Sequence, residues 1–538
     1  MDSFERFIVE NEGADTVRLV MSRREWPSPG DAGLAGLDAK SLAVNTIEGR
    51  KKLRKKLPEW VACSRLVYPS TLCTEQCSSS DTARYKASIV QRIFNEHGRP
   101  VASTLRQAQS TAGSPTEVAG SPTEAAGSPT EAAGSGIVET GSAACRDGLR
   151  ISKLSVASTV ASTGSATKGT GSAAKGTGSA TDCFLVTELA EVTEPKNGKV
   201  ADLTGGLGVD SWAFSEVAEE VLYNEMNPER AAAARHNFQA LGATNIFIRN
   251  CEATADSLEE ILGDFKPDVI FMDPARRDSV GKKVFLLEDC SPDVLKMLPQ
   301  MFETSRFILL KISPMADITM VVERLDRTYE SFLDENHKGG WNGQWVREVH
   351  VVASCGECKE LLILLDREWR NGYSLTCRED GGTLTFTSEE IAGAKAVYPD
   401  ATFARIIFEP GKSLTKAGVF NAVCERFGLV KLARFTHLYT IGEPLSDSEL
   451  EQRTAPLKDF GKVFYVKEIL PLNKATMKDV GKRYPHSEVS AKNIPMSSDE
   501  LRVRLKVRSG DDAHIFGARI ETPYNEDNYL IVTEPTGR

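Results

Sequence analysis

Short apolar runs alternate with segments of helical apolar spacing in the middle of the chain. This alternation predicts βαβ units and a parallel sheet. A largely apolar hairpin around Cys355 would add two more strands, so we expect a seven-stranded α/β sheet within residues 183–370. The other expected strands are 199–204, 221–225, 245–249, 269–272 and 306–312, and the expected helices are 209–218, 229–241 and 257–262.

The pattern changes on both sides of this region. Residues 1–100 have apolar positions at helical spacing, which predicts an N-terminal helical region. Residues 101–182 carry seven-residue Gly-Ser-Pro-Thr-Glu repeats and Gly-Ser-Ala repeats with no apolar seam, so burial cannot offset the ordering entropy. We expect a low-complexity, disordered insertion there. The remainder predicts two small α+β domains, over residues 371–450 and 451–538.

Charge and apolar content limit the location and partners of the protein. The net charge of the 538 residues is -10, which gives no general attraction to nucleic acid. From Lys458 to Arg508, however, twelve Lys and Arg face six Asp and Glu, a net charge of +6. This stretch, the basic patch, is a candidate nucleic-acid-binding face. With no apolar run of membrane-spanning length and no signal peptide, we expect a cytoplasmic protein without a membrane partner.

The cysteines give little indication of a metal or a disulfide. There are eleven, an odd number scattered along the chain, which suits reduced thiols. Cys355 and Cys358 form a CxxC pair that could be half of a zinc site or a redox pair, but no second CxxC accompanies it. Because the flanking segments are apolar and extended, we favour a hairpin turn and expect no metal.

A glycine-rich turn follows the first expected strand. It contains Thr204, Gly205, Gly206 and Gly208, with Asp202 before it and Asp210 after it. Glycines allow close approach of the backbone to a ligand, but the third glycine of a dinucleotide-binding turn is replaced by Ser211. The carboxylate of Asp202 would repel a pyrophosphate and attract a cationic amino group. The turn therefore favours a ligand with such a group over a dinucleotide.

Further acids lie at the ends of the next two strands. Glu225 ends the second strand, 23 residues after Asp202, where a carboxylate can accept hydrogen bonds from two ribose hydroxyls. Glu252 follows the third strand and could accept from an adenine amino group, with Asp256 as its competitor.

The fourth strand leads into Asp273-Pro274-Ala275-Arg276-Arg277. In an open α/β sheet, ligands bind at this carboxyl edge. The carboxylate of Asp273 and the backbone carbonyls beside Pro274 could accept hydrogen bonds from an exocyclic amine. Arg276 and Arg277 could meet phosphate, although an arginine beside Asp278 could instead form a surface ion pair.

Several motifs together resemble a bacterial family of class I methyltransferases with a ferredoxin-like domain and a C-terminal THUMP-like domain. The central sheet is similar to the trimethylguanosine synthases, which methylate the N2 amine of guanine in RNA caps. Here Ala275 and Arg276 replace the second proline and the aromatic residue of that motif, so the chain lacks the ring that would stack on a purine at this point. The motifs are 75–79, 82–86, 202–210, 273–276, 409–412 and 470–474.

The resemblance implies a Rossmann-like seven-stranded methyltransferase sheet and S-adenosylmethionine as cofactor. It implies that the methyl acceptor is an RNA base, which Asp273 and Pro274 contact at the reaction centre. It also implies that a THUMP-like domain binds the RNA. The alternatives are methylation of a small molecule or protein, an oxidoreductase, and a non-catalytic RNA-binding module with a vestigial pocket. The expected cofactor contacts are Asp202, Thr204, Gly205, Gly206, Gly208, Asp210, Glu225 and Glu252.

Overall fold

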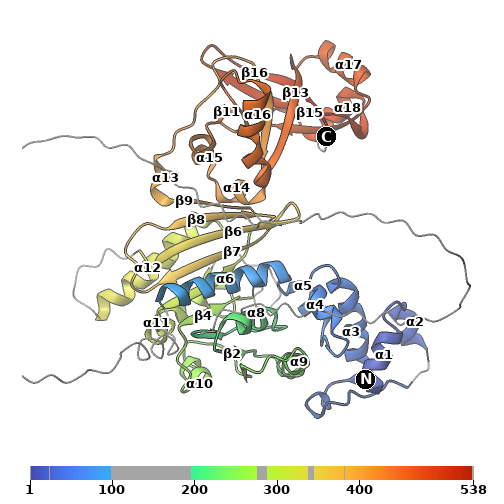
Figure 1. Ribbon diagram of the computed structural model, residues 1–538, viewed down its shortest axis with the longest axis vertical. Coiled ribbons are helices and arrows are strands. Elements are labelled where there is room, and N and C mark those ends of the chain that lie inside the picture. The colour runs from blue at the N-terminus through green and yellow to red at the C-terminus, as the bar shows by residue number, and fades with distance from the viewer. Residues whose placement is uncertain are drawn as a thin grey trace, which may run out of the picture. The chain divides into compact units, whose positions relative to one another are not determined.

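The computed structural model describes residues 2–22, 25–97, 196–275, 287–336, 344–380 and 382–535. The expected insertion at 101–182 and both Arg276 and Arg277 lie outside these ranges. The described residues form N-terminal helices, a large sheet with helices on both faces, and a second sheet near the C-terminus (Figure 1).

The expected N-terminal helical region is confirmed. Asp2, Asp15 and Asp38 each cap a helix by accepting a backbone N–H with the side chain, which satisfies amides that have no partner within the helix. The helices are α1 (Ser3–Glu10), α2 (Thr16–Met21), α3 (Ala39–Leu53), α4 (Pro58–Ala62), α5 (Thr71–Gln76) and α6 (Ser80–His97).

The large sheet has nine strands rather than the expected seven. All seven expected strands are present, and β8 and β9 extend the sheet because β8 pairs in parallel with β6. The expected domain boundary after residue 370 therefore lies within this sheet. The strand order is β3-β2-β1-β4-β5-β7-β6-β8-β9, and the first five strands are parallel. Their bounds are β1 (Lys199–Asp202), β2 (Glu220–Asn224), β3 (Ile246–Arg249), β4 (Val269–Met272), β5 (Phe307–Ile312), β6 (Val346–Ser354), β7 (Glu357–Asp366), β8 (Ser374–Glu379) and β9 (Gly382–Thr387).

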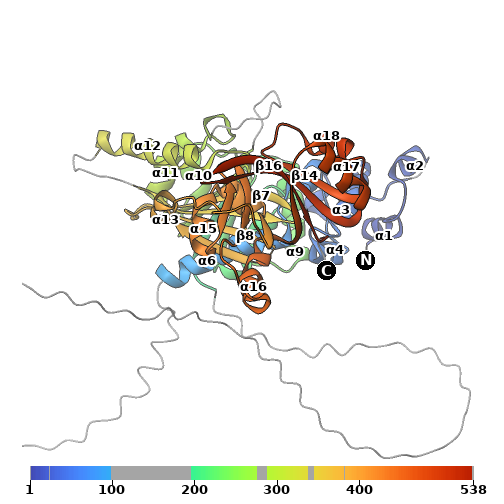
Figure 2. The same cartoon turned by 90° about the horizontal axis from the view of Figure 1, so that it is seen from above.

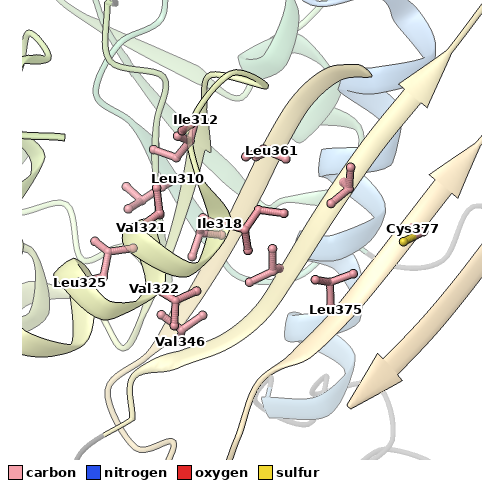
Figure 3. Packing of buried hydrophobic residues seen from close by; sticks show 14 of the residues in the cluster. Leu310, Ile312, Ile318, Val321, Val322, Leu325, Val346, Leu361, Leu375 and Cys377 are labelled. Carbon is pink, nitrogen blue, oxygen red and sulfur yellow. The ribbon is translucent and has the colours of Figure 1, made fainter. Parts of the chain in front are cut away.

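Helices cover both faces of this sheet. On one face, α6 packs beside α8 (Val209–Val217) over a cluster that includes Leu309 and Leu364, and α9 (Pro228–Ala240) packs on Tyr223. On the other face lie α10 (Leu258–Leu262), α11 (Val294–Thr304) and α12 (Ile318–Asn336). Figure 2 shows α6 and α12 on opposite sides of the sheet. Figure 3 shows Ile318 and Val322 of α12 against the aliphatic side chains of the sheet.

The CxxC pair lies at a hairpin, as expected. Cys355 and Gly356 are the two residues between β6 and β7, and both have positive φ, 53° and 74°. Two such residues form a tight turn whose twist matches that of the strands. The hairpin interpretation is thus confirmed.

The C-terminal part is built on one shared sheet. The long strand β13 pairs through its first half with β10 and through its second half with β16, so the two expected small domains share the sheet. Its order is β11-β12-β10-β13-β16-β15-β14. The strands are β10 (Ile406–Pro410), β11 (Val430–Ala433), β12 (Thr436–Thr440), β13 (Gly461–Pro471), β14 (His486–Lys492), β15 (Arg508–Thr522) and β16 (Asn525–Thr533). The helices are α13 (Ser388–Gly393), α14 (Lys412–Ala417), α15 (Phe420–Phe427), α16 (Asp447–Thr454), α17 (Lys474–Arg483) and α18 (Ser498–Leu505). Among the described helices, none is long and apolar enough to cross a membrane.

Candidate functional site

The large sheet has a topological switch point between β1 and β4. From β1 the chain continues to β2 and β3 on one side, whereas β4 and β5 lie on the other. Ligands of open α/β sheets bind in the crevice that this reversal opens at the carboxyl ends of the strands. Asp202 is the last residue of β1 and Asp273 directly follows β4, so the two expected acids lie at this point.

The glycine turn connects β1 to α8. The Gly205 amide donates to the carbonyl of Asn224 at 2.7 Å, which holds the turn against the end of β2. Gly206 and Gly208 have φ values of 56° and 91°, a region that favours glycine. A Cβ added at Gly208 would lie 2.6 Å from the Phe238 ring, whereas one at Gly206 would have only the Thr204 carbonyl within 4 Å. Gly208 therefore serves packing, and Gly206 leaves open space beside the turn.

Asp202 is buried directly under this turn. Its carboxylate accepts hydrogen bonds from the Ser211 hydroxyl at 2.5 Å and the Thr204 amide at 3.1 Å. Burial, together with the negative charges of Asp210 and Asp273, raises the pKa of Asp202 to about 7, although the two hydrogen bonds act in the opposite direction. The carboxyl group thus changes its charge near neutral pH.

Glu225 lies beside the turn, after the end of β2. Its two carboxylate oxygens accept from the amides of Gly206 at 2.9 Å and Asn227 at 2.8 Å, and the side chain is buried. The neighbouring Asn224 donates to the carbonyls of Leu203 and Cys251. Asn224 therefore ties the glycine turn to the loop after β3, a role that the sequence analysis did not identify.

Asp273 is joined to the glycine turn through Thr204. The Asp273 amide donates to the Thr204 hydroxyl oxygen at 2.6 Å, and the following Pro274 is buried. The Asp273 side chain is 34% exposed, and its Oδ2 accepts from the Lys311 ammonium at 2.6 Å. The acidic end of β4 and the glycine turn therefore form one site.

Asp210 is held by residues from the N-terminal region. Its Oδ2 accepts from the Ser78 hydroxyl at 2.8 Å, and its Oδ1 lies 3.1 Å from the Lys86 ammonium. Lys86 is fully buried and also contacts Glu360 of β7 at 2.9 Å. Lys86 and Glu360 were not among the expected site residues, although Ser78 and Lys86 belong to the two N-terminal motifs.

The expected adenine contact is not part of this cluster. Glu252 is exposed in the loop after β3, where its backbone carbonyl accepts from the Ser257 hydroxyl at 2.6 Å. Its competitor Asp256 is also exposed. The adenine role of Glu252 stays a prediction, as does the phosphate role of Arg276 and Arg277, which lie outside the described residues.

Two family models match the C-terminal part. A ferredoxin-like domain matches residues 407–447, and a THUMP domain-like model matches residues 461–535. The chain contains a ferredoxin-like and a THUMP-like domain. This pair is the one that the motifs indicated, and the THUMP-like domain contains almost all of the basic stretch from Lys458 to Arg508.

The chain also has relatives among known proteins. It is 32% identical over 237 residues to an uncharacterized S-adenosylmethionine-dependent methyltransferase of Mycobacterium tuberculosis, found in two strains. The match covers 43% of this chain and 56% of the relative, so the chain spans about half the length of the curated relatives it matches. A crystal structure described as a candidate methyltransferase from Porphyromonas gingivalis is 23% identical, with a TM-score of 0.65 over 99% of this chain and 97% of that one. This likeness confirms the fold, a Rossmann-like α/β sheet with appended α+β domains.

Proposed function

We propose that this protein is an S-adenosylmethionine-dependent methyltransferase that acts on a base of structured RNA, such as tRNA or rRNA. The observation that carries this proposal is the link from Asp202 through Thr204 to Asp273 at the switch point. This link connects the glycine turn, with the buried Asp202 beneath it, to the partly exposed carboxylate of Asp273, which a second ligand can reach. The name of the Mycobacterium tuberculosis relative supports the cofactor and the reaction.

The residues beside the turn fit the proposed cofactor. Asp202 and Asp210 supply negative charge for a cationic methionine amino group, directly or through water, and Gly206 leaves room where a side chain would intrude. The Glu225 carboxylate accepts a hydrogen bond from the Gly206 amide, which places it beside the turn, where it would meet the ribose of the cofactor. When bound, the cofactor supplies a methyl group activated by a sulfonium.

The remaining chemistry requires orientation more than covalent catalysis. Asp273 can accept a hydrogen bond from an exocyclic amine and so hold its nitrogen toward the cofactor side of the site. Holding two reactants at contact distance supplies much of the rate enhancement of a bimolecular transfer. Pro274 fixes the backbone after Asp273, and the THUMP-like domain would grip the RNA.

The proposal is tested by binding and by transfer. Titration calorimetry should detect S-adenosylhomocysteine binding and no NAD binding. With labelled S-adenosylmethionine, the protein should transfer methyl groups to RNA from a strain that lacks the gene. Mass spectrometry of nucleosides from this strain should show that one modified nucleoside of the parent strain is absent. Labelling of a protein or small molecule instead would move the acceptor to another class, and cofactor binding without any transfer would indicate a vestigial pocket. Binding of NAD alone would contradict the proposal.

Cofactor affinity should rise with pH between 5.5 and 7. The pKa of Asp202 is raised to about 7, so its carboxyl is protonated at the lower end of this range. A cationic amino group favours the ionised form, so binding releases a proton, and affinity increases by at most about tenfold per pH unit. Calorimetry in buffers of different ionisation enthalpy would measure both the affinity and the released proton.

Asp202→Asn is the control for this pH dependence. The amide cannot ionise, so the variant should bind more weakly and its affinity should not change between pH 5.5 and 7. A parent affinity that is constant over this range would show that Asp202 does not meet the cationic group.

The basic patch contains three lysines in one row of α17. Lys474, Lys478 and Lys482 are spaced by four residues, so they lie along one side of the helix. All three are exposed, and within the described parts of the chain none has a carboxylate partner within 4 Å. Arg483 of the same helix, in contrast, pairs with Glu468 and Asp479. The row is thus free to contact phosphates.

Replacing the three lysines with glutamine should weaken RNA binding and its salt dependence. Log K falls as log salt rises, and each lost phosphate contact makes this slope shallower by about 0.7–0.9. The slope of the triple variant should therefore be shallower than that of the parent by about 2–3. Filter binding at several salt concentrations would measure the slope, with total tRNA as the probe. Arg483→Gln is the matched control and should change the slope by less than one contact. An unchanged slope in the triple variant would show that this row of lysines does not contact the RNA phosphates.

A further inference from the structure

A chain of alternating charges crosses the interior beside the proposed site. It runs from Asp210 through Lys86, Glu360 and Lys311 to Asp273, and its members come from α8, α6, β7, β5 and the end of β4. The Lys86 ammonium is 3.1 Å from Asp210 and 2.9 Å from Glu360. The Lys311 ammonium is 3.9 Å from Glu360 and 2.6 Å from Asp273. The chain therefore ends on the carboxylate that the proposed function assigns to the acceptor.

Lys311 is an unusual residue in its strand. It follows Leu309 and Leu310 in the otherwise apolar β5 and shares a face of the sheet with Phe307 and Leu309. Burial alone would lower the pKa of Lys311, but Asp273, Glu360 and Asp210 raise it above its ordinary value. The ammonium therefore stays charged. Because burying a charge is costly even when it is paired, and packing alone would be served by an apolar residue, Lys311 is a candidate for a role in function.

The contacts of Asp273 leave one oxygen available. The Lys311 ammonium holds Oδ2, and the Asp273 amide is fixed on the Thr204 hydroxyl. Among the described residues, Oδ1 accepts no hydrogen bond. The backbone and one carboxylate oxygen are thus fixed, while the other oxygen is available to a ligand.

We propose that Lys311 is a positioning residue for methyl transfer, which holds Oδ2 of Asp273 so that Oδ1 is presented to the acceptor amine. This inference rests on the proposed function. On the interior side the Lys311 ammonium lies 3.9 Å from Glu360, which Lys86 holds in turn, so Lys311 acts on the acceptor through Asp273 and not on the cofactor.

The test compares Lys311→Met with Lys311→Arg. Labelled S-adenosylmethionine and total RNA from a strain lacking the gene serve as substrates in single-turnover reactions. Lys311→Met should lower the transfer rate at saturating cofactor by about tenfold or more, because the acceptor is no longer oriented. Lys311→Arg should recover most of the rate. Affinity for S-adenosylhomocysteine should stay within about threefold of the parent in both variants. A large loss of this affinity would show that Lys311 supports the cofactor pocket and would overturn the inference.

A double variant separates positioning from a general structural effect. In an Asp273→Ala background, Lys311→Met should cause no further loss of rate, because its target is gone. This double variant also removes both charges of the pair, which avoids an unpartnered group if Lys311→Met alone folds poorly. Independent, multiplicative losses would show that Lys311 does not act through Asp273.

Arg306→Met is the control on the same segment of chain. Arg306 precedes β5 at its opposite end and pairs with Asp366, far from Asp273 along the strand. This variant should transfer methyl groups at the parental rate. If the parent labels no RNA, the proposed function fails and the inference with it. If Asp273→Ala is impaired but Lys311→Met is not, only the inference fails.

Discussion

Asp273→Ala should bind S-adenosylmethionine within about threefold of the parent, yet transfer the methyl group about a hundredfold more slowly at saturation. The cofactor turn is expected to survive because the contact between Asp273 and Thr204 is made by the backbone amide, which alanine keeps. What is lost is the carboxylate that would orient the acceptor amine. Calorimetry and single-turnover methylation would measure the two effects separately.

Glu225→Ala should fail in the opposite way. It removes a charged acceptor beside the ribose position, worth roughly 1.5–3 kcal/mol, so cofactor affinity should drop about ten- to a hundredfold. Turnover should partly recover at saturating cofactor.

For the Asp273→Ala prediction, Asp273→Asn keeps the shape of the side chain and controls for stability. Loss of cofactor binding in Asp273→Ala, or transfer at the parental rate, would falsify the acceptor assignment.

Lys86→Met should destabilise the protein by about 3–5 kcal/mol, because it leaves Asp210 without its cation and the buried Glu360 with Lys311 alone, at 3.9 Å. Lys86 is fully buried, Glu360 is 3% exposed, and the same ammonium also contacts Asp210. Urea denaturation followed by circular dichroism would measure the change as a lower transition midpoint.

The neighbouring Arg84 offers a matched control on the same helix. Its side chain is 54% exposed and pairs with Glu59, so Arg84→Met should cost about 0–1 kcal/mol. Adding Glu360→Gln to Lys86→Met should restore part of the lost stability, since it removes the buried negative charge that Lys86 no longer neutralises. A loss no greater than that of Arg84→Met would mean that water reaches the Lys86 site and screens the charges.

The cofactor side of the site could be predicted from the sequence because its residues follow strand ends. Asp202, Glu225 and Asp273 each end or follow an apolar run, and parallel strands bring their carboxyl ends to one edge. The turn glycines were found for the same reason. Glu252 obeys the same rule, but the loop after β3 leaves it exposed, because strand order does not determine the path of a loop.

The interior charges could not be found in this way. Lys311 and Glu360 occupy apolar strands, and their partners are far away in the sequence, so local pattern gives no pairing. A lone charge in a buried strand was the available signal. The same limit applies to β8 and to β13, whose pairing with distant strands extends one sheet and joins two expected domains in the other. Periodicity predicts a strand but not its neighbour.

The place of α6 in the chain affects how the protein is made. Lys86 leaves the ribosome 274 residues before Glu360. At about 5–20 residues per second, roughly 14 to 55 s pass before the two can meet. The apolar side of α6, with Ala87, Val90 and Phe94, gains its cover earlier, as α8 and the strands from β1 to β5 are made. The N-terminal helices are therefore exposed to chaperones on the nascent chain until α8 and these strands are made, and the buried charge of Lys86 meets Glu360 only late in synthesis.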